Sequence, residues 1–214
     1  DFSSKYIPKE KTVRETLSHR VDLVCFSGDK LIGGPQAGFI AGKHSMIKQI
    51  NSNPMKRAMR MDKIRIAGLI AVLQLYLNPD TLPERLPTLR LLTRKYTEIK
   101  STAHALCPKI TQALNNVCTV EVIDCKSQIG SGALPTDLIP SAGLSIRPRF
   151  TVKNTKAEKS RALIQVAKNF RRLPVPIIGK LNNGALELDL RCLEQINVLT
   201  DQLPILCQIF GSDK

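Results

Sequence analysis

The sequence predicts a mixed α/β chain made of two parts that meet near residues 78–83. Short apolar runs that end at glycine turns indicate strands, and longer stretches with apolar residues every three or four positions indicate helices. An Asn-Gly pair at residues 183–184, between two apolar runs, is a strong signal of a β-hairpin. The chain has 214 residues, of which 43% are hydrophobic, so it is long enough to bury a core and too apolar to be disordered.

The first part is expected to hold two buried strands and two helices. Residues 21–26 and 39–42 are short apolar runs, and a short helix is predicted over residues 44–50. Residues 61–77 are strongly helical and apolar on more than one face, and Pro79 ends the pattern. We therefore expect this helix to be buried, either against the body of the protein or in an oligomer interface.

The second part is expected to form a compact α+β domain with an antiparallel sheet. The order of its elements is helix, strand, strand, helix, strand, strand, helix. The predicted elements are a helix over 83–105, a strand over 119–123, a loop over 128–132, a strand over 143–147, a basic helix over 157–171, hairpin strands over 177–181 and 185–190, and a helix over 193–203.

The chain is strongly basic, with 32 Lys+Arg against 18 Asp+Glu and a formal net charge of +14. Residues 147–172 hold nine basic residues and one acidic residue, and residues 43–65 hold seven and one. Such charge favours polyanionic partners, although solvated helix faces explain each stretch equally well. With six Phe, three Tyr and no Trp, a base-stacking platform is disfavoured, so a nucleic acid would be held through its backbone and shape.

Several other classes of protein are disfavoured. No apolar run approaches the roughly 18 residues of a membrane span, and the first residues lack the pattern of a signal peptide. The six cysteines form no Cys-x-x-Cys pair and the three histidines lie far from any ligand spacing, so no metal site is expected. These features favour a cytoplasmic protein without a membrane partner.

The most informative segment for chemistry is residues 26–38, which hold Lys30 among glycines directly after a predicted strand. A lysine in this position can pack against a planar cofactor, and desolvation generally favours the neutral amine that forms a Schiff base with pyridoxal phosphate. Ser27 could bind the cofactor phosphate, and Asp29 could orient the lysine or shuttle a proton. On composition alone, a tight loop with an ordinary exposed Asp-Lys pair is the favoured interpretation.

This segment resembles the cofactor-lysine motif of the bacterial selenocysteine synthase family, the L-seryl-tRNA(Sec) selenium transferases. Further segments are similar to the family in the same order, and the similarity covers about residues 1–203. Collinear motifs over this length are highly specific. The further matching segments are residues 54–63, 86–94, 127–135, 173–179 and 189–193.

The resemblance implies the end of a fold-type-I transferase that depends on pyridoxal 5'-phosphate. Residues 1–80 would be the carboxy-terminal part of its large, cofactor-binding domain. Residues 81–205 would be a smaller α+β carboxy-terminal domain, and residues 206–214 a tail. Because the family's enzymes are much longer, we expect a carboxy-terminal portion that binds the cofactor poorly in isolation and is inactive alone.

The resemblance also implies roles for individual residues. Lys30 would hold the cofactor as the Schiff-base lysine and remove the α-proton of the seryl group, and Asp29 matches the family's aspartate beside that lysine. Ser27, as argued above, would contribute to the cofactor pocket. Gly33 and Gly34, which let the backbone approach closely, would shape either that pocket or a subunit contact.

Arg57 and Arg60 match the family's arginines that bind the anionic selenium donor, selenophosphate. Their spacing of three residues predicts that both guanidinium groups lie on one helix face, where they suit a phosphate-like anion. Without the resemblance, a solvated face would be the favoured interpretation of this pair.

The implied reaction converts seryl-tRNA(Sec) to selenocysteinyl-tRNA(Sec), a step of selenocysteine and protein biosynthesis, by β-elimination and addition of selenium. The implied partners are seryl-tRNA(Sec), selenophosphate and further copies of the chain in a decamer, and no DNA. Residues 147–172 are a candidate tRNA surface. Two alternatives stay open: another fold-type-I lyase or transferase, and a non-catalytic basic module for tRNA binding or assembly.

Overall fold

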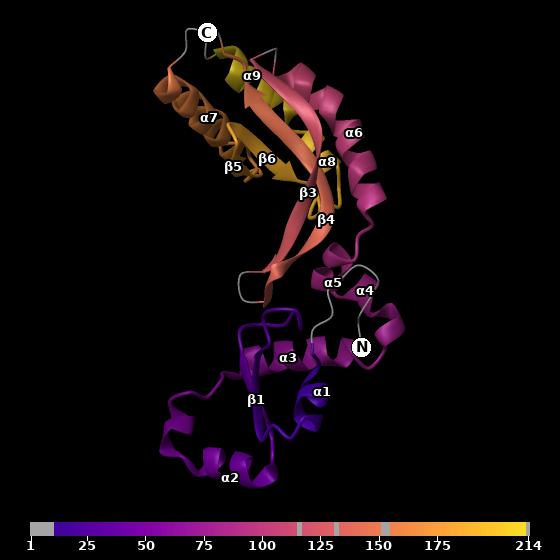
Figure 1. Cartoon of the computed structure of the whole chain (residues 1–214), viewed down its shortest axis with the longest axis vertical. Helices are drawn as coiled ribbons and strands as arrows, with labels where there is room; N and C mark the ends of the chain where they lie inside the picture. The colour runs from indigo at the N-terminus through magenta and orange to yellow at the C-terminus, as the bar shows by residue number, and fades with distance from the viewer. Residues whose placement is uncertain (1–10, 115–116, 131–132, 151–154, 213–214) are drawn as a thin grey trace. The chain divides into compact units, whose positions relative to one another are not determined.

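The chain folds into two compact units, each made of helices and antiparallel strands (Figure 1). The mixed α/β composition predicted from the sequence is therefore confirmed. The division between the units falls after Thr93 rather than near residue 80, and the assignment of a large and a small domain stays a prediction. The computed structural model describes residues 11–114, 117–130, 133–150 and 155–212. The first unit holds residues 1–93 and 128–139, and the second holds residues 94–127 and 140–214.

The first unit is built around a two-stranded antiparallel sheet. β1 (Leu23–Ser27) pairs with β2 (Gly38–Gly42), which confirms both strands, but the expectation that they are buried is wrong, since neither strand holds a buried residue. The rings of Phe26 and Phe39 stack across the pair with centroids 5.0 Å apart. A two-stranded hairpin is marginally stable by itself, so it depends on the helices around it. These are α1 (Val13–Ser18), α2 (His44–Ser52), η1 (Pro54–Arg57), α3 (Lys63–Leu75), η2 (Pro79–Thr81), α4 (Leu82–Arg85) and α5 (Pro87–Leu92).

The apolar helix predicted over residues 61–77 forms as α3 and begins where the Asp62 side chain accepts a hydrogen bond from the Arg65 amide. The expectation that it is buried against the body of the chain is wrong. Leu69 is its buried side chain, whereas Ile64 is 85% exposed. A helix that is apolar all round offers more apolar surface than the loop against it covers. Other exposed apolar side chains of α3 are Ile66, Ile70 and Leu73.

The single helix predicted over residues 83–105 is wrong, because the chain breaks twice and forms α4, α5 and α6 (Tyr96–Ala113). Leu86 is extended because Pro87 disfavours helical backbone in the residue before it. Lys95 is also extended and precedes α6. That helix continues past Pro108, where burial of the following turns offsets the lost hydrogen bond.

A four-stranded antiparallel sheet in the order β3-β4-β6-β5 belongs mainly to the second unit, and only the β3 and β4 residues within 128–139 are grouped with the first. The Asn-Gly hairpin is confirmed, since Asn183 and Gly184 have φ of 46° and 74°, the two positive values that a tight I′ turn requires. β3 and β4 are longer than predicted, and the loop expected at 128–132 is strand as far as Gly130, while residues 131–132 lie outside the described residues. The strands are β3 (Cys118–Gly130), β4 (Ala133–Pro148), β5 (Lys180–Asn182) and β6 (Ala185–Asp189).

Helices α6, α7 (Lys156–Arg171) and α9 (Leu203–Ser212) share one hydrophobic core with this sheet. α7 matches the predicted basic helix. The helix predicted over 193–203 is wrong, because α8 (Asn197–Thr200) and α9 take its place. The expected tail is also helical as far as residue 212, and it buries side chains at helical spacing. Core residues are Leu106, Ile110, Leu144, Ile146, Phe170, Leu186, Leu206 and Phe210.

Two arginines from distant segments form a polar network inside the second unit. Arg191 is only 2% exposed, and its guanidinium donates hydrogen bonds to a serine and to two carbonyl oxygens. Its acceptors are Ser127 Oγ at 3.0 Å and the carbonyl oxygens of Arg94 and Pro140 at 3.1 and 2.5 Å. Arg94 Nη1 donates in return to the carbonyl oxygens of Leu190, Arg191 and Leu193, at 3.0, 2.6 and 2.9 Å.

The Arg94–Arg191 network extends to Asp189 at the end of β6. The Asp189 carboxylate accepts hydrogen bonds from the Ser127 and Ser141 hydroxyls and from the Arg191 amide. The network thus joins three of the segments that resemble the selenium transferases, and it holds the backbone around residues 190–193 in a non-helical turn. The helices that follow therefore begin only at Asn197 and Leu203.

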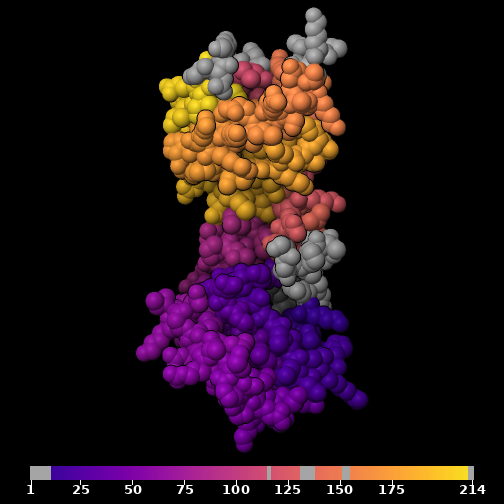
Figure 2. Space-filling view, turned by 90° about the vertical axis from the view of Figure 1, so that its left-hand side faces the viewer, coloured from indigo at the N-terminus to yellow at the C-terminus, as the bar shows by residue number. Residues whose placement is uncertain are grey.

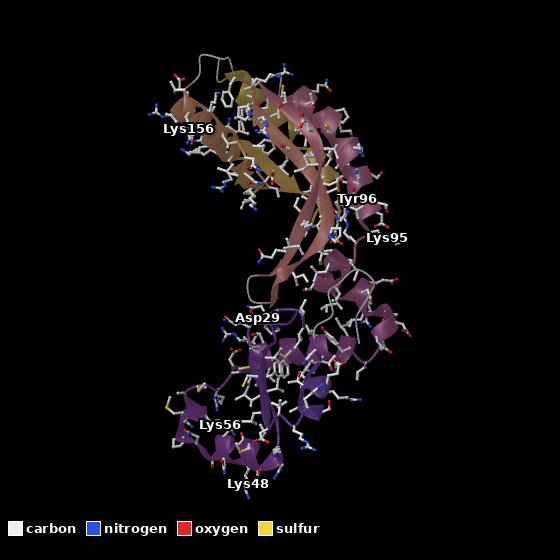
Figure 3. All side chains as sticks on the ribbon, viewed as in Figure 1. Asp29, Lys48, Lys56, Lys95, Tyr96 and Lys156 are labelled. Atoms are coloured by element: carbon white, nitrogen blue, oxygen red, sulfur yellow. The ribbon has the colours of Figure 1, made fainter. Side chains whose placement is uncertain are left out.

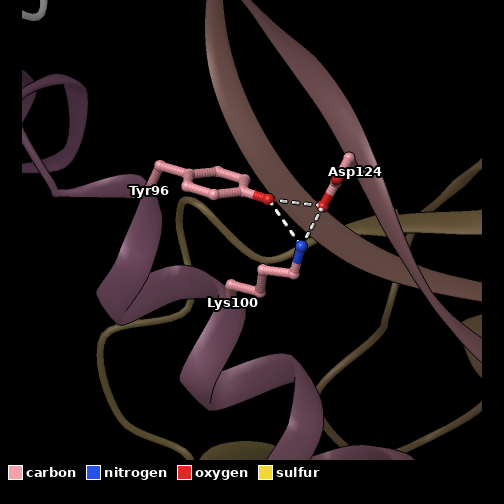
Figure 4. A network of polar contacts seen from close by, with 3 residues as sticks. All are labelled: Tyr96, Lys100 and Asp124. Atoms are coloured by element: carbon pink, nitrogen blue, oxygen red, sulfur yellow. Dashed lines mark hydrogen bonds and ion pairs between the residues drawn. The ribbon is translucent and has the colours of Figure 1, made fainter.

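A second polar cluster joins α6 to β3 at the surface of the same unit (Figure 4). Tyr96 Oη donates to Asp124 Oδ1 at 2.6 Å, and Lys100 Nζ lies 2.7 Å from Tyr96 Oη and 2.9 Å from Asp124 Oδ1. The hydrogen bond from Tyr96 and the nearby Lys100 lower the pKa of Asp124. The carboxylate therefore stabilises this contact above its ordinary pKa, and the stabilisation is lost as the pH falls.

We predict that Arg191→Leu lowers the free energy of unfolding by about 2–4 kcal/mol, because it leaves buried acceptors without their donor. Arg172→Leu is the control, since Arg172 is exposed and its loss should change the free energy by about 0.5 kcal/mol or less. Urea unfolding followed by circular dichroism measures both. Equal effects of the two substitutions would contradict the role of the network.

Candidate active site around Lys30

Lys30 lies in the loop that connects β1 to β2, and backbone hydrogen bonds close this loop on itself. The Gly28 amide donates to the Ala37 carbonyl oxygen at 2.8 Å and so extends the pairing of the hairpin. The Gly34 amide donates to the Gly28 carbonyl oxygen at 2.8 Å, and the Gly33 amide donates to the Lys30 carbonyl oxygen at 2.9 Å. The lysine therefore sits in a turn of defined backbone.

The turn that follows Lys30 is attached to the carboxyl end of α3. Tyr76 directly follows this helix, and its hydroxyl donates to the Ile32 carbonyl oxygen at 3.0 Å and lies 3.4 Å from that of Leu31. The side chain is half-buried, and burial raises the pKa of the Tyr76 hydroxyl. Tyr76 thus fixes the turn through carbonyl oxygens that the hairpin itself does not use.

Two glycines of the loop make close approaches to helices of the same unit. Gly33 has a φ of 73°, and a Cβ added there would lie 2.9 Å from Thr88 Oγ1. A Cβ added at Gly34 would lie 3.0 Å from Cδ2 of Leu69, the buried residue of α3. The geometry therefore gives Gly33 and Gly34 a role in packing the loop, and their contact with a cofactor stays a prediction.

Lys30 and Asp29 form an ion pair at the surface of the first unit. Lys30 Nζ lies 2.5 Å from Asp29 Oδ2, with side chains 44% and 24% exposed. The lysine is thus not desolvated in this chain. The hydrogen bond from Lys30 lowers the pKa of the Asp29 carboxyl, so the pair is stabilising above the ordinary carboxyl pKa and weakens as the pH falls.

Ser27 is the last residue of β1, opposite Gly38, and it is exposed. The loop therefore presents a primary amine and a hydroxyl three residues apart, with a carboxylate beside the amine. These groups match the chemistry of a cofactor that carries an aldehyde and a phosphate, because the amine can form a Schiff base and the hydroxyl can donate to a phosphate oxygen. The residues present thus fit pyridoxal phosphate.

The prediction that Arg57 and Arg60 share one helix face is wrong. Arg57 ends the short helix η1, and Arg60 lies outside any helix. Asn53 caps the start of η1 at Pro54, and Asp62 caps the start of α3 at Lys63, so no single helix runs through both arginines. Both arginines are exposed.

The structure does not bring these arginines to Lys30. Within the described part of the chain, no hydrogen bond or ion pair joins Arg57 or Arg60 to Lys30 or Asp29. Figure 3 shows Asp29 at one end of the β1–β2 hairpin and Lys56, the neighbour of Arg57, well away from it. Their role toward selenophosphate stays a prediction.

Sequence reasoning missed the residues that hold the loop in place: Tyr76, Thr88 and Leu69. Tyr76 lies 44 residues beyond the Ile32 carbonyl oxygen that it binds, and no local pattern indicates such a pairing. The available signal was a tyrosine at the end of an otherwise apolar helix, because a hydroxyl there needs a partner once it is half-buried.

Neither a membrane-spanning helix nor a metal site is found in the described ranges. Across residues 11–114, 117–130, 133–150 and 155–212, none of the helices combines the length and the apolar character needed to cross a bilayer. In the same ranges, no group of three or more His, Cys, Asp or Glu side chains is placed to hold a metal ion.

We predict that Lys30→Met raises the pKa of the Asp29 carboxyl back toward its ordinary value, because the substitution removes the donor that stabilises the carboxylate. Carbon-detected NMR titration of the side-chain carboxyls measures this shift. Asp62 is the internal control, since the Arg65 amide lowers its pKa in the same unit and should continue to do so. An unchanged Asp29 titration in the variant would contradict the ion pair.

The chain is similar to known proteins over most of its length. The family model described as L-seryl-tRNA selenium transferase matches residues 1–194. A curated relative from Rhizobium meliloti (strain 1021), named L-seryl-tRNA(Sec) selenium transferase, is 51% identical over 194 residues. Relatives of the same name from Methylocella silvestris and Salmonella arizonae are 51% and 48% identical over 193 and 194 residues.

These matches include 90–91% of this chain and 39–40% of each relative. The chain therefore spans about two fifths of the length of the relatives it matches. The segment with Lys30 and the segments of the Arg94–Arg191 network all lie inside the region matched by the family model. On this agreement over most of its length, the chain belongs to the L-seryl-tRNA selenium transferase family.

Proposed function

We propose that this chain carries the cofactor lysine of an L-seryl-tRNA(Sec) selenium transferase. The whole enzyme would convert seryl-tRNA(Sec) to selenocysteinyl-tRNA(Sec) with selenophosphate as donor, in the cytoplasm and as a homo-oligomer, a decamer by family resemblance. The observation that carries the proposal is the exposed amine of Lys30, which an anchored loop presents beside the Asp29 carboxylate. The relatives' names support the choice of substrate.

In this proposal Lys30 Nζ has two tasks. It would bind pyridoxal phosphate covalently, and once released it would accept the proton from the α-carbon of the seryl group. Bound cofactor would supply an electron sink for the charge left on that carbon. Asp29 would hold the lysine by its ion pair and stabilise the ammonium that forms when the proton arrives.

The remaining residues would bind and position. The Ser27 hydroxyl would donate to the cofactor phosphate, while Gly33 and Gly34 would keep the loop close to its supporting helices. Arg57 and Arg60 would bind the selenium donor, because guanidinium groups form strong charge-assisted hydrogen bonds with phosphate oxygens. The two arginines lie in separate local structures, Arg57 in η1 and Arg60 after it, so each would bind the donor from its own segment.

A hybrid enzyme tests the proposal without assuming that this chain acts alone. Residues 1–194 replace the matching region of the Rhizobium meliloti relative, and formation of selenocysteinyl-tRNA from seryl-tRNA(Sec) and selenophosphate is measured. We expect an active hybrid, and Lys30→Ala should lower its rate by about a hundred- to ten-thousandfold. A folded hybrid that transfers no selenium, or that keeps its rate after Lys30→Ala, would refute the proposal.

The same hybrid tests the donor site. Arg57→Gln and Arg60→Gln should each raise the KM for selenophosphate by about tenfold or more, because each removes a charge-assisted hydrogen bond. Lys56→Gln is the matched control, since it removes an exposed positive charge beside Arg57. Equal effects of all three substitutions would indicate general attraction of the anion instead of two specific contacts.

A further inference from the structure

Helix α7 exposes an unusual excess of positive charge. Its only acidic residue, Glu158, is occupied at the start of the helix, where it accepts a hydrogen bond from the Thr155 amide at 2.7 Å and its own amide donates to Thr155 Oγ1. In the described part of the chain, no carboxylate forms an ion pair with the basic residues of this helix. The exposed basic residues are Lys156, Lys159, Arg161, Lys168, Arg171 and, directly after the helix, Arg172.

Three of these charges lie on the side of α7 that faces solvent along its whole length, and the others are exposed near its ends. Val166, Asn169 and Phe170 are buried against the core of the second unit. Arg161, Lys168 and Arg172 follow the spacing i, i+7, i+11, which places three side chains on one helix face. Figure 2 shows α7, in orange, across the face of this unit that is turned toward the viewer.

The stability of the helix does not explain all of these charges. Lys168 and Arg171 lie in the last turn, where positive charge interacts favourably with the helix dipole. Lys156 and Lys159 lie in the first turn, where the dipole disfavours positive charge. Arg161 lies between the two ends. A basic helix that includes unfavourable positions indicates an anionic partner outside the chain.

The composition of the face favours phosphates over bases. The one aromatic side chain of α7, Phe170, is buried, so the helix itself exposes no ring on which a base could stack. The partly exposed ring of Phe150 lies beside the helix, but Lys159 Nζ is already placed over it, 5.8 Å from the centroid. Extended guanidinium and ammonium groups along one face suit a chain of phosphates. We infer that the exposed face of α7 binds the phosphate backbone of the tRNA substrate, an inference that rests on the proposed function for its choice of RNA.

The inference is tested on the 214-residue chain with a tRNA(Sec) transcript, whose binding is followed by fluorescence anisotropy across a range of salt concentrations. The variant combines Arg161→Gln, Lys168→Gln and Arg172→Gln. A matched control removes three exposed lysines from elsewhere in the same unit: Lys95→Gln, Lys109→Gln and Lys126→Gln. Both variants lose the same charge, and thermal unfolding confirms that each is folded.

We expect the α7 variant to bind the transcript about tenfold to a hundredfold more weakly, and the slope of log K against log salt to fall by about two to three. The control should lose much less affinity and keep its slope. Equal loss in both variants, no loss in the α7 variant, or no binding by the unmodified chain would each overturn the inference. Binding is read without selenium transfer, so failure here is distinguishable from failure of the hybrid enzyme.

Discussion

The candidate site depends on the attachment of one loop to one helix. Without its contacts to Tyr76, Leu69 and Thr88, the turn after Lys30 would rest on a two-stranded hairpin alone, which is a marginal support. The hydroxyl of Tyr76 and the side chain of Leu69 connect that turn to α3. Thr88 of α5 lies close to Gly33 in the same turn. The lysine can therefore be exposed and still have a defined position, which a residue that binds a cofactor covalently requires.

The second unit has basic residues both in its interior and on its surface, with different roles. Arg191 is buried and donates hydrogen bonds to serine and carbonyl oxygens, so it stabilises the interior of the unit. The arginines and lysines of α7 are exposed, and the core holds that helix by its other side. One unit thus uses the same residue type in two ways, and substitutions should separate them: Arg191 affects folding, whereas the α7 face affects binding.

Patterns of neighbouring residues predict the elements whose structure depends on residues close in the sequence. Short apolar runs and turn residues predict strands β1 and β2 and the Asn-Gly hairpin, and α7 also matches its predicted range. The breaks on both sides of α5 were missed because the apolar period continues through them. For the site, Asp29 and Lys30 were predicted as a pair, but Tyr76 was not, because its partner is distant in the chain. Likewise, the spacing of Arg57 and Arg60 indicates one helix face, yet two helix caps interrupt that helix.

We propose Lys30 as the residue that binds pyridoxal phosphate. The most direct measurement is borohydride reduction of the hybrid enzyme with the cofactor, followed by peptide mapping of the modified lysine. We predict one dominant phosphopyridoxyl adduct, on Lys30, that is lost in Lys30→Ala. A dominant adduct on another lysine, or one spread over the surface lysines regardless of Lys30, would contradict it.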